Sequence, residues 1–293
     1  MTGAAAARVA SATLVLVSVA AVVVAGAGRV AAVTGAPRPY ACSPGLRAPG
    51  AVGRPDAVSA SIGDTRVTLA ARSGGGLAHV LTDERVVVRT PFATLVRPLP
   101  RVVAYLLTMG SQVCLVAGPP APSVIVLAYS GGAHCCFSAL GFAATAAGLA
   151  RPLARVDLAD GATLGVANGR VVVRAAQGAF AYTFDDYAQS AEPIVLEAFD
   201  GRAFVEVTRD HPGLVRGDAR TWDRLFARDP SDLSYLAAWV ADESLLGRGA
   251  LAWRRVDALE AASRLRGTVG YPSGRGFARR LWLLLGALGY PSG

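Results

Sequence analysis

The residues best suited to chemistry gather in the stretch Tyr129–Phe137, which reads Tyr-Ser-Gly-Gly-Ala-His-Cys-Cys-Phe. This stretch follows the apolar run Val124–Ala128, whose length and composition predict a buried strand. Two adjacent glycines permit positive φ, so the strand is expected to end in a tight turn. The expected turn residues are Ser130, Gly131, Gly132 and His134. A hydroxyl, an imidazole and two thiols in one turn point to disulfide formation, metal binding or nucleophilic catalysis.

Disulfide formation is the simplest chemistry for the cysteines. The chain has four, at Cys42, Cys114, Cys135 and Cys136. Neighbouring side chains on a strand point to opposite faces, so the last two need different partners. We expect them to pair with Cys114 and Cys42, which closes a long loop worth roughly 4 kcal/mol in the chain-entropy model. A disulfide between the two adjacent cysteines is a more strained alternative.

Metal binding and catalysis fit the turn less well. Tetrahedral zinc takes ligands two to four residues apart or from separate elements, not three in a row. His79 or His211 would have to complete such a site from afar, so no metal or other cofactor is expected. An adjacent histidine cannot accept the proton of a cysteine nucleophile. The remaining catalytic hypothesis is a hydrolase that uses His134 with a remote acid.

The composition is that of a globular protein with a sizeable core. Of the 293 residues 53% are hydrophobic and 17% are charged, which excludes general disorder. All 29 basic residues are arginine, and the formal net charge is +8. They form no recognisable nucleic-acid-binding module with aromatic residues, so no nucleic-acid partner is expected. Attraction to an anionic membrane or envelope polymer fits the charge better.

The N-terminus predicts export. No residue from Val9 to Gly28 is charged, and these twenty residues at about 1.5 Å each span roughly 30 Å, the thickness of a bilayer core. Residues 1–34 are therefore expected to form a signal peptide or a membrane anchor. Small residues near Ala27 and Ala32 offer cleavage sites, and cleavage would release a secreted protein. Without cleavage, the helix would contact the membrane and hold the protein at the extracytoplasmic face.

Two further regions are expected between the N-terminus and residue 210. Residues 35–63, rich in Pro, Gly and Ala, have the composition of a linker. Residues 64–210 alternate short apolar runs with Gly, Pro and Asp, which predicts an antiparallel β domain. Asn168-Gly169 is a strong signal for a hairpin. The predicted strands are 65–71, 85–89, 111–117, 123–129, 135–143, 153–158, 170–175 and 179–184.

Residues 211–293 are expected to be helical. Asp229-Pro230 provides a capping residue and a proline for the first helical position, and Gly247 provides a stop. Two further helices are predicted over 250–266 and 276–288. The span from Arg248 to Arg280 holds eight arginines against two acidic residues, a local charge of +6. These arginines form either a solvated helix face or a surface for anionic lipid or an envelope polymer.

Three segments together resemble a group of exported bacterial proteins of unknown function. They are Tyr129–Cys136, the aromatic run Phe180–Ser190, and Phe204–Arg209 followed by Pro212. In that group a Gly-Gly-Ala-His-Cys-Cys turn lies inside a small β-sheet domain, and the resemblance covers roughly residues 110–250. Members often carry an Asp-rich, calcium-type turn before the strand that leads into the motif. Residues 118–123 hold no carboxylate here, so the resemblance does not extend to a calcium site, and it implies no activity.

The sequence therefore predicts an α+β protein with an N-terminal transmembrane or signal helix, an antiparallel β domain and a helical C-terminal region. The expected function is that of a non-enzymatic binding or structural module of the bacterial cell envelope, stabilised by disulfides. The alternative is the extracytoplasmic hydrolase with His134 in its site.

Overall fold

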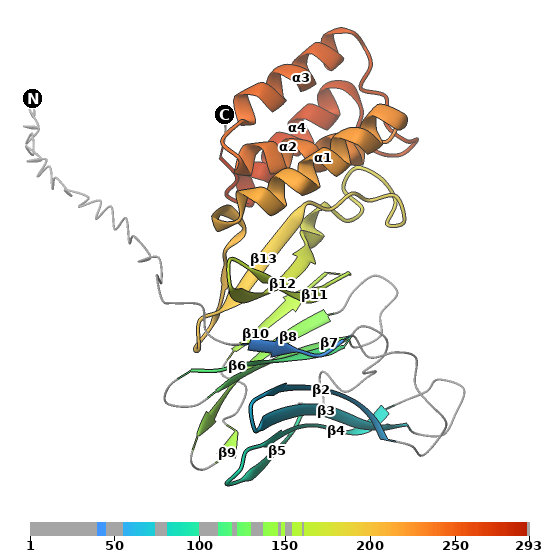
Figure 1. Cartoon of the computed structure of the whole chain (residues 1–293). Coiled ribbons are helices and arrows are strands. Elements are labelled where there is room, and N and C mark those ends of the chain that lie inside the picture. Colours follow the sequence, from blue (N-terminus) through green and yellow to red (C-terminus); the bar gives the residue numbers. More distant parts are fainter. Residues whose placement is uncertain are drawn as a thin grey trace, which may run out of the picture. The chain divides into compact units, whose positions relative to one another are not determined.

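The computed structural model describes residues that all belong to one compact unit, Ala36–Gly293. They are 40–44, 55–73, 81–99, 111–118, 122–129, 137–145, 148–149, 154–159 and 161–291. Within them three antiparallel sheets come first along the chain and four α-helices follow, so the α+β prediction is confirmed for this part (Figure 1). The run Val9–Gly28 lies outside the described residues. No helix within them is long and apolar enough to cross a bilayer.

The first sheet is a meander of four strands in chain order. It contains β2 (Pro55–Ile62), β3 (Thr65–Ser73), β4 (Leu81–Arg89) and β5 (Thr94–Pro98). The second sheet has the order β1-β6-β7-β8-β10, and β9 pairs with the end of β8. Its strands are β1 (Tyr40–Cys42), β6 (Gln112–Val116), β7 (Ser123–Tyr129), β8 (Phe137–Thr145), β9 (Gly148–Leu149) and β10 (Ala154–Leu158). Every strand pair is antiparallel, as predicted.

The third sheet joins the β region to the helices. Its order is β11 (Thr163–Ala167), β12 (Arg170–Ala176), β13 (Ile194–Phe199) and β14 (Phe204–Glu206). The predicted hairpin is confirmed, because Asn168-Gly169 connects β11 to β12 with φ of 49° and 72°. Positive φ at both central positions matches the twist of the flanking strands, and Asn and Gly adopt it at the lowest cost.

The three sheets are stacked, and β7 is buried on both of its faces. Val124 and Val126 belong to the core between the first and second sheets. Ile125 and Leu127 belong to the core between the second and third sheets. Successive side chains of a strand point to opposite faces, so an unbroken apolar run such as Val124–Ala128 fits a central strand covered on both sides.

The predicted linker needs correction, because residues 35–63 contain β1 and β2. β2 pairs with β3 along its full length, and β1 pairs with β6. The alternation of Val58 and Ala60, both buried, with exposed residues between them is a strand pattern. Small residues and prolines hid this pattern, since the composition of the segment as a whole resembles that of a linker. The β region therefore begins before residue 64.

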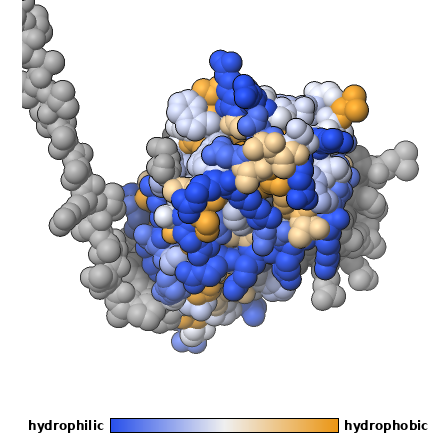
Figure 2. All heavy atoms as spheres, turned by 90° about the horizontal axis from the view of Figure 1, so that it is seen from above, coloured by the Kyte–Doolittle hydropathy of each residue, from blue (hydrophilic) through white to orange (hydrophobic). Residues whose placement is uncertain are grey.

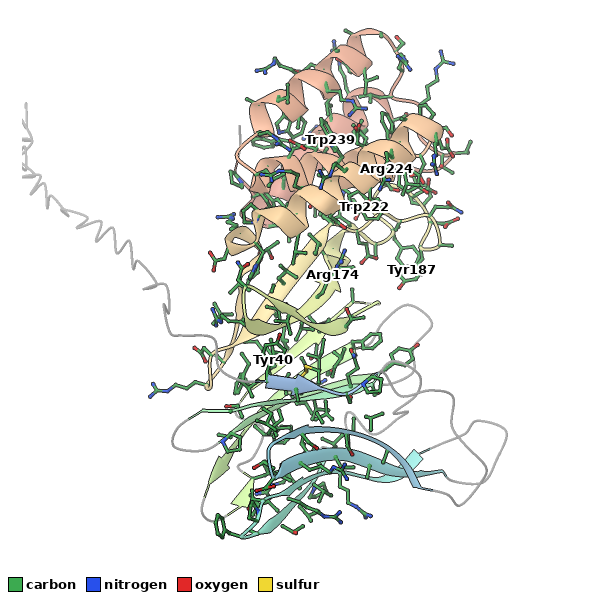
Figure 3. The ribbon with its side chains drawn as sticks, in the orientation of Figure 1. Tyr40, Arg174, Tyr187, Trp222, Arg224 and Trp239 are labelled. Atoms are coloured by element: carbon green, nitrogen blue, oxygen red, sulfur yellow. A yellow bond between two sulfur atoms is a disulfide. The ribbon has the colours of Figure 1, made fainter. Side chains whose placement is uncertain are left out.

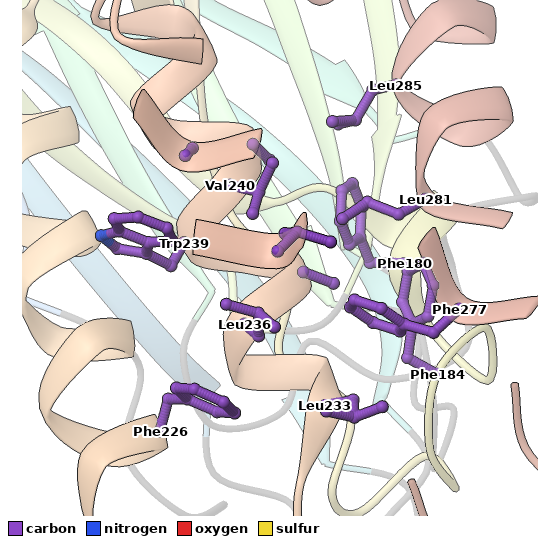
Figure 4. Packing of buried hydrophobic residues seen from close by; sticks show 14 of the residues in the cluster. Phe180, Phe184, Phe226, Leu233, Leu236, Trp239, Val240, Phe277, Leu281 and Leu285 are labelled. Carbon is purple, nitrogen blue, oxygen red and sulfur yellow. The ribbon is translucent and has the colours of Figure 1, made fainter. Parts of the chain in front are cut away.

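The strand predicted over 179–184 is also wrong. Residues Gly178–Phe180 form a short 3₁₀ helix and turns follow it. Phe180 and Phe184, four residues apart, both point into the core of the helical region, where Phe184 meets Phe277 at 5.2 Å between ring centroids (Figure 4). A strand would also send residues 180 and 184 to one face, so the period of the aromatic residues alone could not exclude it.

The helical region consists of α1 (Pro212–Arg228), α2 (Leu233–Leu245), α3 (Gly249–Ala261) and α4 (Gly274–Ala287). α1 lies in the region 211–293 that was expected to be helical, although no separate helix was predicted there, and it packs on the third sheet through Val215. α2 is capped by Asp232 rather than Asp229, because the Asp232 side chain accepts the Ser234 N–H at 2.9 Å. Gly247 ends this helix as predicted, with φ of 74°. α3 stops before 266 because Arg264 N–H bonds to the Leu259 carbonyl, a C-terminal closing bond.

Candidate functional site

Cys42 and Cys114 form a disulfide between neighbouring strands of the second sheet. They are partners in the β1–β6 register, with Cα atoms 4.1 Å apart. Cys114 is fully buried in the core between the second and third sheets. The prediction that both cysteines form a disulfide is confirmed. The predicted pairing of Cys42 and Cys114 with Cys135 and Cys136 is wrong, because the register of β1 on β6 places the first two opposite each other.

The motif turn lies between two described strands. β7 ends at Tyr129 and β8 begins at Phe137, and these two residues are cross-strand partners with rings stacked at 4.8 Å between centroids. Residues 130–136 therefore connect the two strands of one hairpin. Ser130, Gly131, Gly132, His134, Cys135 and Cys136 lie outside the described residues, so their predicted roles stay predictions.

His211 is the histidine that the structure describes, and it serves the fold. Its side chain is buried, and its Nδ1 lies 3.1 Å from the side-chain nitrogen of Asn168 in the hairpin turn. Because the amide nitrogen donates this bond, Nδ1 is the acceptor and Nε2 carries the proton. Burial lowers the pKa of His211, which keeps the ring neutral. Within the described ranges no three His, Cys, Asp or Glu side chains gather closely enough to hold a metal ion.

Two aspartates, one on α1 and one on α2, include the described side chain whose pKa is raised furthest. We call Asp218 and Asp242 the carboxyl pair. Asp242 is completely buried, and no donor among the described residues reaches either of its carboxyl oxygens. The negative charge of Asp218 acts on it and raises its pKa. Two ionised carboxylates so close together in a buried site repel each other, so one member of the pair is expected to be protonated.

The contacts of Asp218 decide which member carries the proton. Its Oδ2 accepts the indole N–H of Trp222 at 2.9 Å and the backbone N–H of Ile194 at 3.0 Å. Its Oδ1 lies 3.4 Å from a guanidinium nitrogen of Arg174. Three donors stabilise an ionised carboxylate at Asp218. Asp242 has no such donors, so it is the member of the pair that burial keeps protonated.

The direction of the pKa shifts agrees with this assignment. Burial, followed by the negative charge of Asp218, raises the pKa of Asp242 from 3.8 to about 10. Burial also raises the pKa of Asp218, but the donors of Trp222, Ile194 and Arg174 oppose that rise. Asp242 therefore remains a neutral acid at neutral pH, as a buried carboxyl beside a negative charge should.

The carboxyl pair connects four elements of the fold. Arg174 comes from β12, Ile194 from β13, Asp218 and Trp222 from α1, and Asp242 from α2. Arg174 of the third sheet and Trp222 of α1, both labelled in Figure 3, donate to the same Asp218 carboxylate. Because Asp242 has no exposed surface, a substrate cannot reach its oxygens without local unfolding. The pair therefore fixes the helices on the sheet rather than offering a catalytic acid and base.

A second acidic pair lies on the third sheet. Glu197 on β13 and Glu206 on β14 are cross-strand partners, so two like charges stand directly opposite each other. Burial and then the charge of Glu206 raise the pKa of Glu197 to about 7. Burial and the carboxyls of Asp242 and Glu206 also raise the pKa of Tyr290, which packs against the helical core. The groups with raised pKa values, Glu197, Tyr290 and the carboxyl pair, therefore all belong to the third sheet or to the helical region packed on it.

The arginine-rich region predicted from the sequence lies on α3, α4 and the loop between them. Three of its eight arginines are in ion pairs, Arg248 with Glu243, Arg255 with Asp223 and Arg275 with Glu260. Arg255 also stacks over Trp239 at 4.6 Å from the ring centroid. The other five are exposed and form no ion pair within the described residues; they are Arg254, Arg264, Arg266, Arg279 and Arg280.

The view onto the helical end of the molecule is dominated by hydrophilic residues, with apolar residues in small separate areas (Figure 2). This surface matches a solvated, basic face more closely than a wide apolar interface for another protein.

Comparison with protein-family models, curated proteins and solved structures finds no match to this chain.

The carboxyl pair was absent from the sequence predictions. One signal pointed toward it, since Asp242 directly follows the apolar residues Val240 and Ala241 inside a helix that is buried almost all round. An acidic residue in such a run needs a buried partner. Its partner Asp218 could not be identified because it lies on a different helix.

Proposed function

We propose that this protein is an exported component of the cell envelope that acts as a non-enzymatic binding or structural module on the extracytoplasmic side of the membrane. The observation that carries the proposal is the Cys42–Cys114 disulfide, which is built into the register of two paired strands. Disulfides are typical of proteins that fold in an oxidising compartment. The apolar run Val9–Gly28 supplies the expected route of export.

The packing of the three sheets and the helical region supports a rigid module with an exposed basic surface for binding. Among the described residues, four clusters of buried side chains hold the three sheets and the helical region together. Each sheet is therefore packed against a neighbouring element. The exposed arginines of the helical region provide a basic surface for an anionic partner in the envelope, either lipid or polymer.

Export is tested with a fusion of alkaline phosphatase to the C-terminus of the full chain in a bacterial host. The fused enzyme is active only where its own disulfides form, so an exported chain gives active phosphatase. A matched fusion with Leu16→Arg and Val22→Arg in the apolar run should be inactive, because two charges prevent insertion. Equal activity of both fusions, or inactivity of both, would contradict the proposal.

The disulfide is tested in the same cells. Thiols are blocked with an alkylating reagent before lysis, and the peptides are mapped by mass spectrometry without reduction. We expect Cys42 and Cys114 in one linked peptide pair. If both cysteines are found alkylated in the exported chain, the disulfide is absent and the proposal loses the observation on which it rests.

Variants of His134 distinguish the binding or structural module from the alternative function as a hydrolase. His134→Ala in the exported chain is compared with His134→Gln, which retains a polar side chain. A binding or structural module should lose its cellular phenotype only where the variants also lose thermal stability. Loss of the phenotype in both variants at unchanged thermal stability would favour the hydrolase.

A further inference from the structure

The exposed face of α4 combines two kinds of side chain that soluble helices usually keep apart. Phe277, Leu281 and Leu285, spaced four residues apart, are buried and hold the helix on the helical core. On the outer side Trp282 is 60% exposed and Leu283 is 49% exposed. A large aromatic and a large aliphatic residue are therefore adjacent and accessible on a helix whose apolar face is already in use.

Arginines surround this apolar pair. Arg279 lies four residues before Leu283, on the same side of the helix, and Arg280 lies on the flank next to it. Both are exposed and form no ion pair in the described part of the chain. Arg275 is paired only with Glu260, and its side chain is 93% exposed. An exposed ion pair of this kind contributes little and leaves the arginine available to another anion.

The charge of α4 is of one sign. Its sequence, from Gly274 to Ala287, contains three arginines and no acidic residue. The loop before it adds Arg264 and Arg266, which are exposed, and the bond from Gly274 N–H to the Leu265 carbonyl at 2.8 Å holds this loop against the first turn of the helix. Of the arginines around the start of α4, Arg275 is paired with Glu260, while Arg264 and Arg266 form no ion pair within the described residues.

We propose that the outer face of α4 docks on the surface of a bilayer that contains anionic lipid. Trp282 and Leu283 enter the interfacial region, where an indole ring places its apolar body in the acyl boundary and its N–H among the headgroups. Arg279 and Arg280 extend their apolar stems along the same surface and bring their guanidinium groups to lipid phosphates. This inference rests on the proposed export, because the expected N-terminal helix would hold the unit beside the membrane.

Lipid fits this face better than a soluble polymer does. A soluble polyanion would bind the guanidinium groups of the arginines and would leave Trp282 and Leu283 exposed to solvent. An apolar protein partner would find arginines on either side of a two-residue apolar area, which is much smaller than the buried core of a stable protein interface. Only a bilayer surface offers phosphate and hydrocarbon within a few ångströms of each other.

The test uses the full chain reconstituted in vesicles of phosphatidylcholine, with or without phosphatidylglycerol, and with lipid brominated close to the headgroup. Bromine quenches tryptophan emission on contact. The chain has four tryptophans, none of them in the apolar N-terminal run. The difference between the wild type and Trp282→Phe isolates the signal of Trp282.

We expect Trp282 to be quenched in the vesicles that contain phosphatidylglycerol and not in neutral vesicles. The variant R279E/R280E should lose this quenching, and high salt should reduce it. The variant R66E/R89E is the matched control, since it reverses two exposed arginines that are cross-strand partners on the first sheet. It should retain the quenching of Trp282.

Three results would overturn the proposal. Trp282 unquenched in anionic vesicles would show that α4 does not reach the bilayer. If R66E/R89E and R279E/R280E lose the quenching of Trp282 equally, the binding depends on the total charge of the protein rather than on α4. Binding to soluble polyphosphate with Trp282 unquenched by anionic vesicles would assign the surface to a polymer.

The same experiment separates this inference from the proposed export. A chain that fails to co-float with neutral vesicles would contradict the N-terminal anchor, and α4 would then be tested by adding the soluble chain to anionic vesicles with the same Trp282 readout. A chain that co-floats while Trp282 stays unquenched would retain the anchor and overturn only the docking of α4.

Discussion

Replacement of Asp242 by asparagine tests whether the carboxyl pair holds a proton in the folded protein. Asparagine has nearly the same size and shape, cannot ionise, and still offers a side-chain N–H to the Asp218 carboxylate. The variant D242N should therefore fold, and the change should appear in how the free energy of unfolding depends on pH.

The sign follows from the direction of the shift. Burial raises the pKa of Asp242 from 3.8 to about 10, so between these values the folded protein holds a proton that the unfolded chain has released. The folded state then binds one more proton than the unfolded state, and its stability falls as pH rises. For one proton the slope is about 1.4 kcal/mol per pH unit, or roughly 4 kcal/mol between pH 5 and pH 8. D242N lacks this group and should not show this loss.

The assay is urea unfolding of the wild type and D242N at several pH values between about 5 and 8. Other groups with raised pKa values, such as Glu197 and Asp232, contribute to both proteins and cancel in the difference. The gap in unfolding free energy should move in favour of D242N by about 1.4 kcal/mol for each pH unit. The variant D257N, which removes an exposed carboxyl on α3, is the matched control for the loss of one carboxyl group. A constant gap between the wild type and D242N across this range would refute the proton on Asp242.

Three further predictions concern stability. C42A/C114A should lose about 4 kcal/mol of unfolding free energy, since the bond links residues 72 apart; reductant should lower the wild type toward the variant, and an unchanged wild type would contradict this. G141A should lose about 1–3 kcal/mol because a Cβ would overlap the ring of Phe199, and F199L should recover part of the loss in a double-mutant cycle. F277A should cost about 3–5 kcal/mol in urea unfolding, while W282A on the outer side of the same helix should stay within about 0.5 kcal/mol; equal losses would contradict the assigned faces of α4.

Local pattern was sufficient wherever a few neighbouring residues determine the backbone. The sequence alone predicted β7 over Ser123–Tyr129, the Asn168-Gly169 hairpin and the end of α2 at Gly247, and all three are confirmed. A continuous apolar run, an Asn-Gly pair and a helix-ending glycine each act through sterics and burial within a few residues. Such local patterns can be interpreted without knowing how the rest of the chain folds.

The errors arose where a local pattern fits two structures. The aromatic residues Phe180 and Phe184 suit a strand or a turn packed against a helical core, and only the position of Phe277 selects the second. Residues 35–63 have the composition of a linker, yet β2 forms because β3 offers it a complete ladder of partners. In both cases contacts with a distant segment determine the backbone more strongly than local secondary-structure propensity does.

The sequence by itself predicted the α+β class, half of the described strands, three of the four described helices, and disulfide formation by Cys42 and Cys114. The tertiary structure decided which residues meet. Cys42 opposes Cys114 through the β1–β6 register, Asp242 meets Asp218 through the packing of α2 on α1, and Arg279 shares an exposed face with Leu283 because the other side of α4 is buried. Such contacts join segments far apart in the chain, so they depend on which elements become neighbours, and no local pattern encodes that choice.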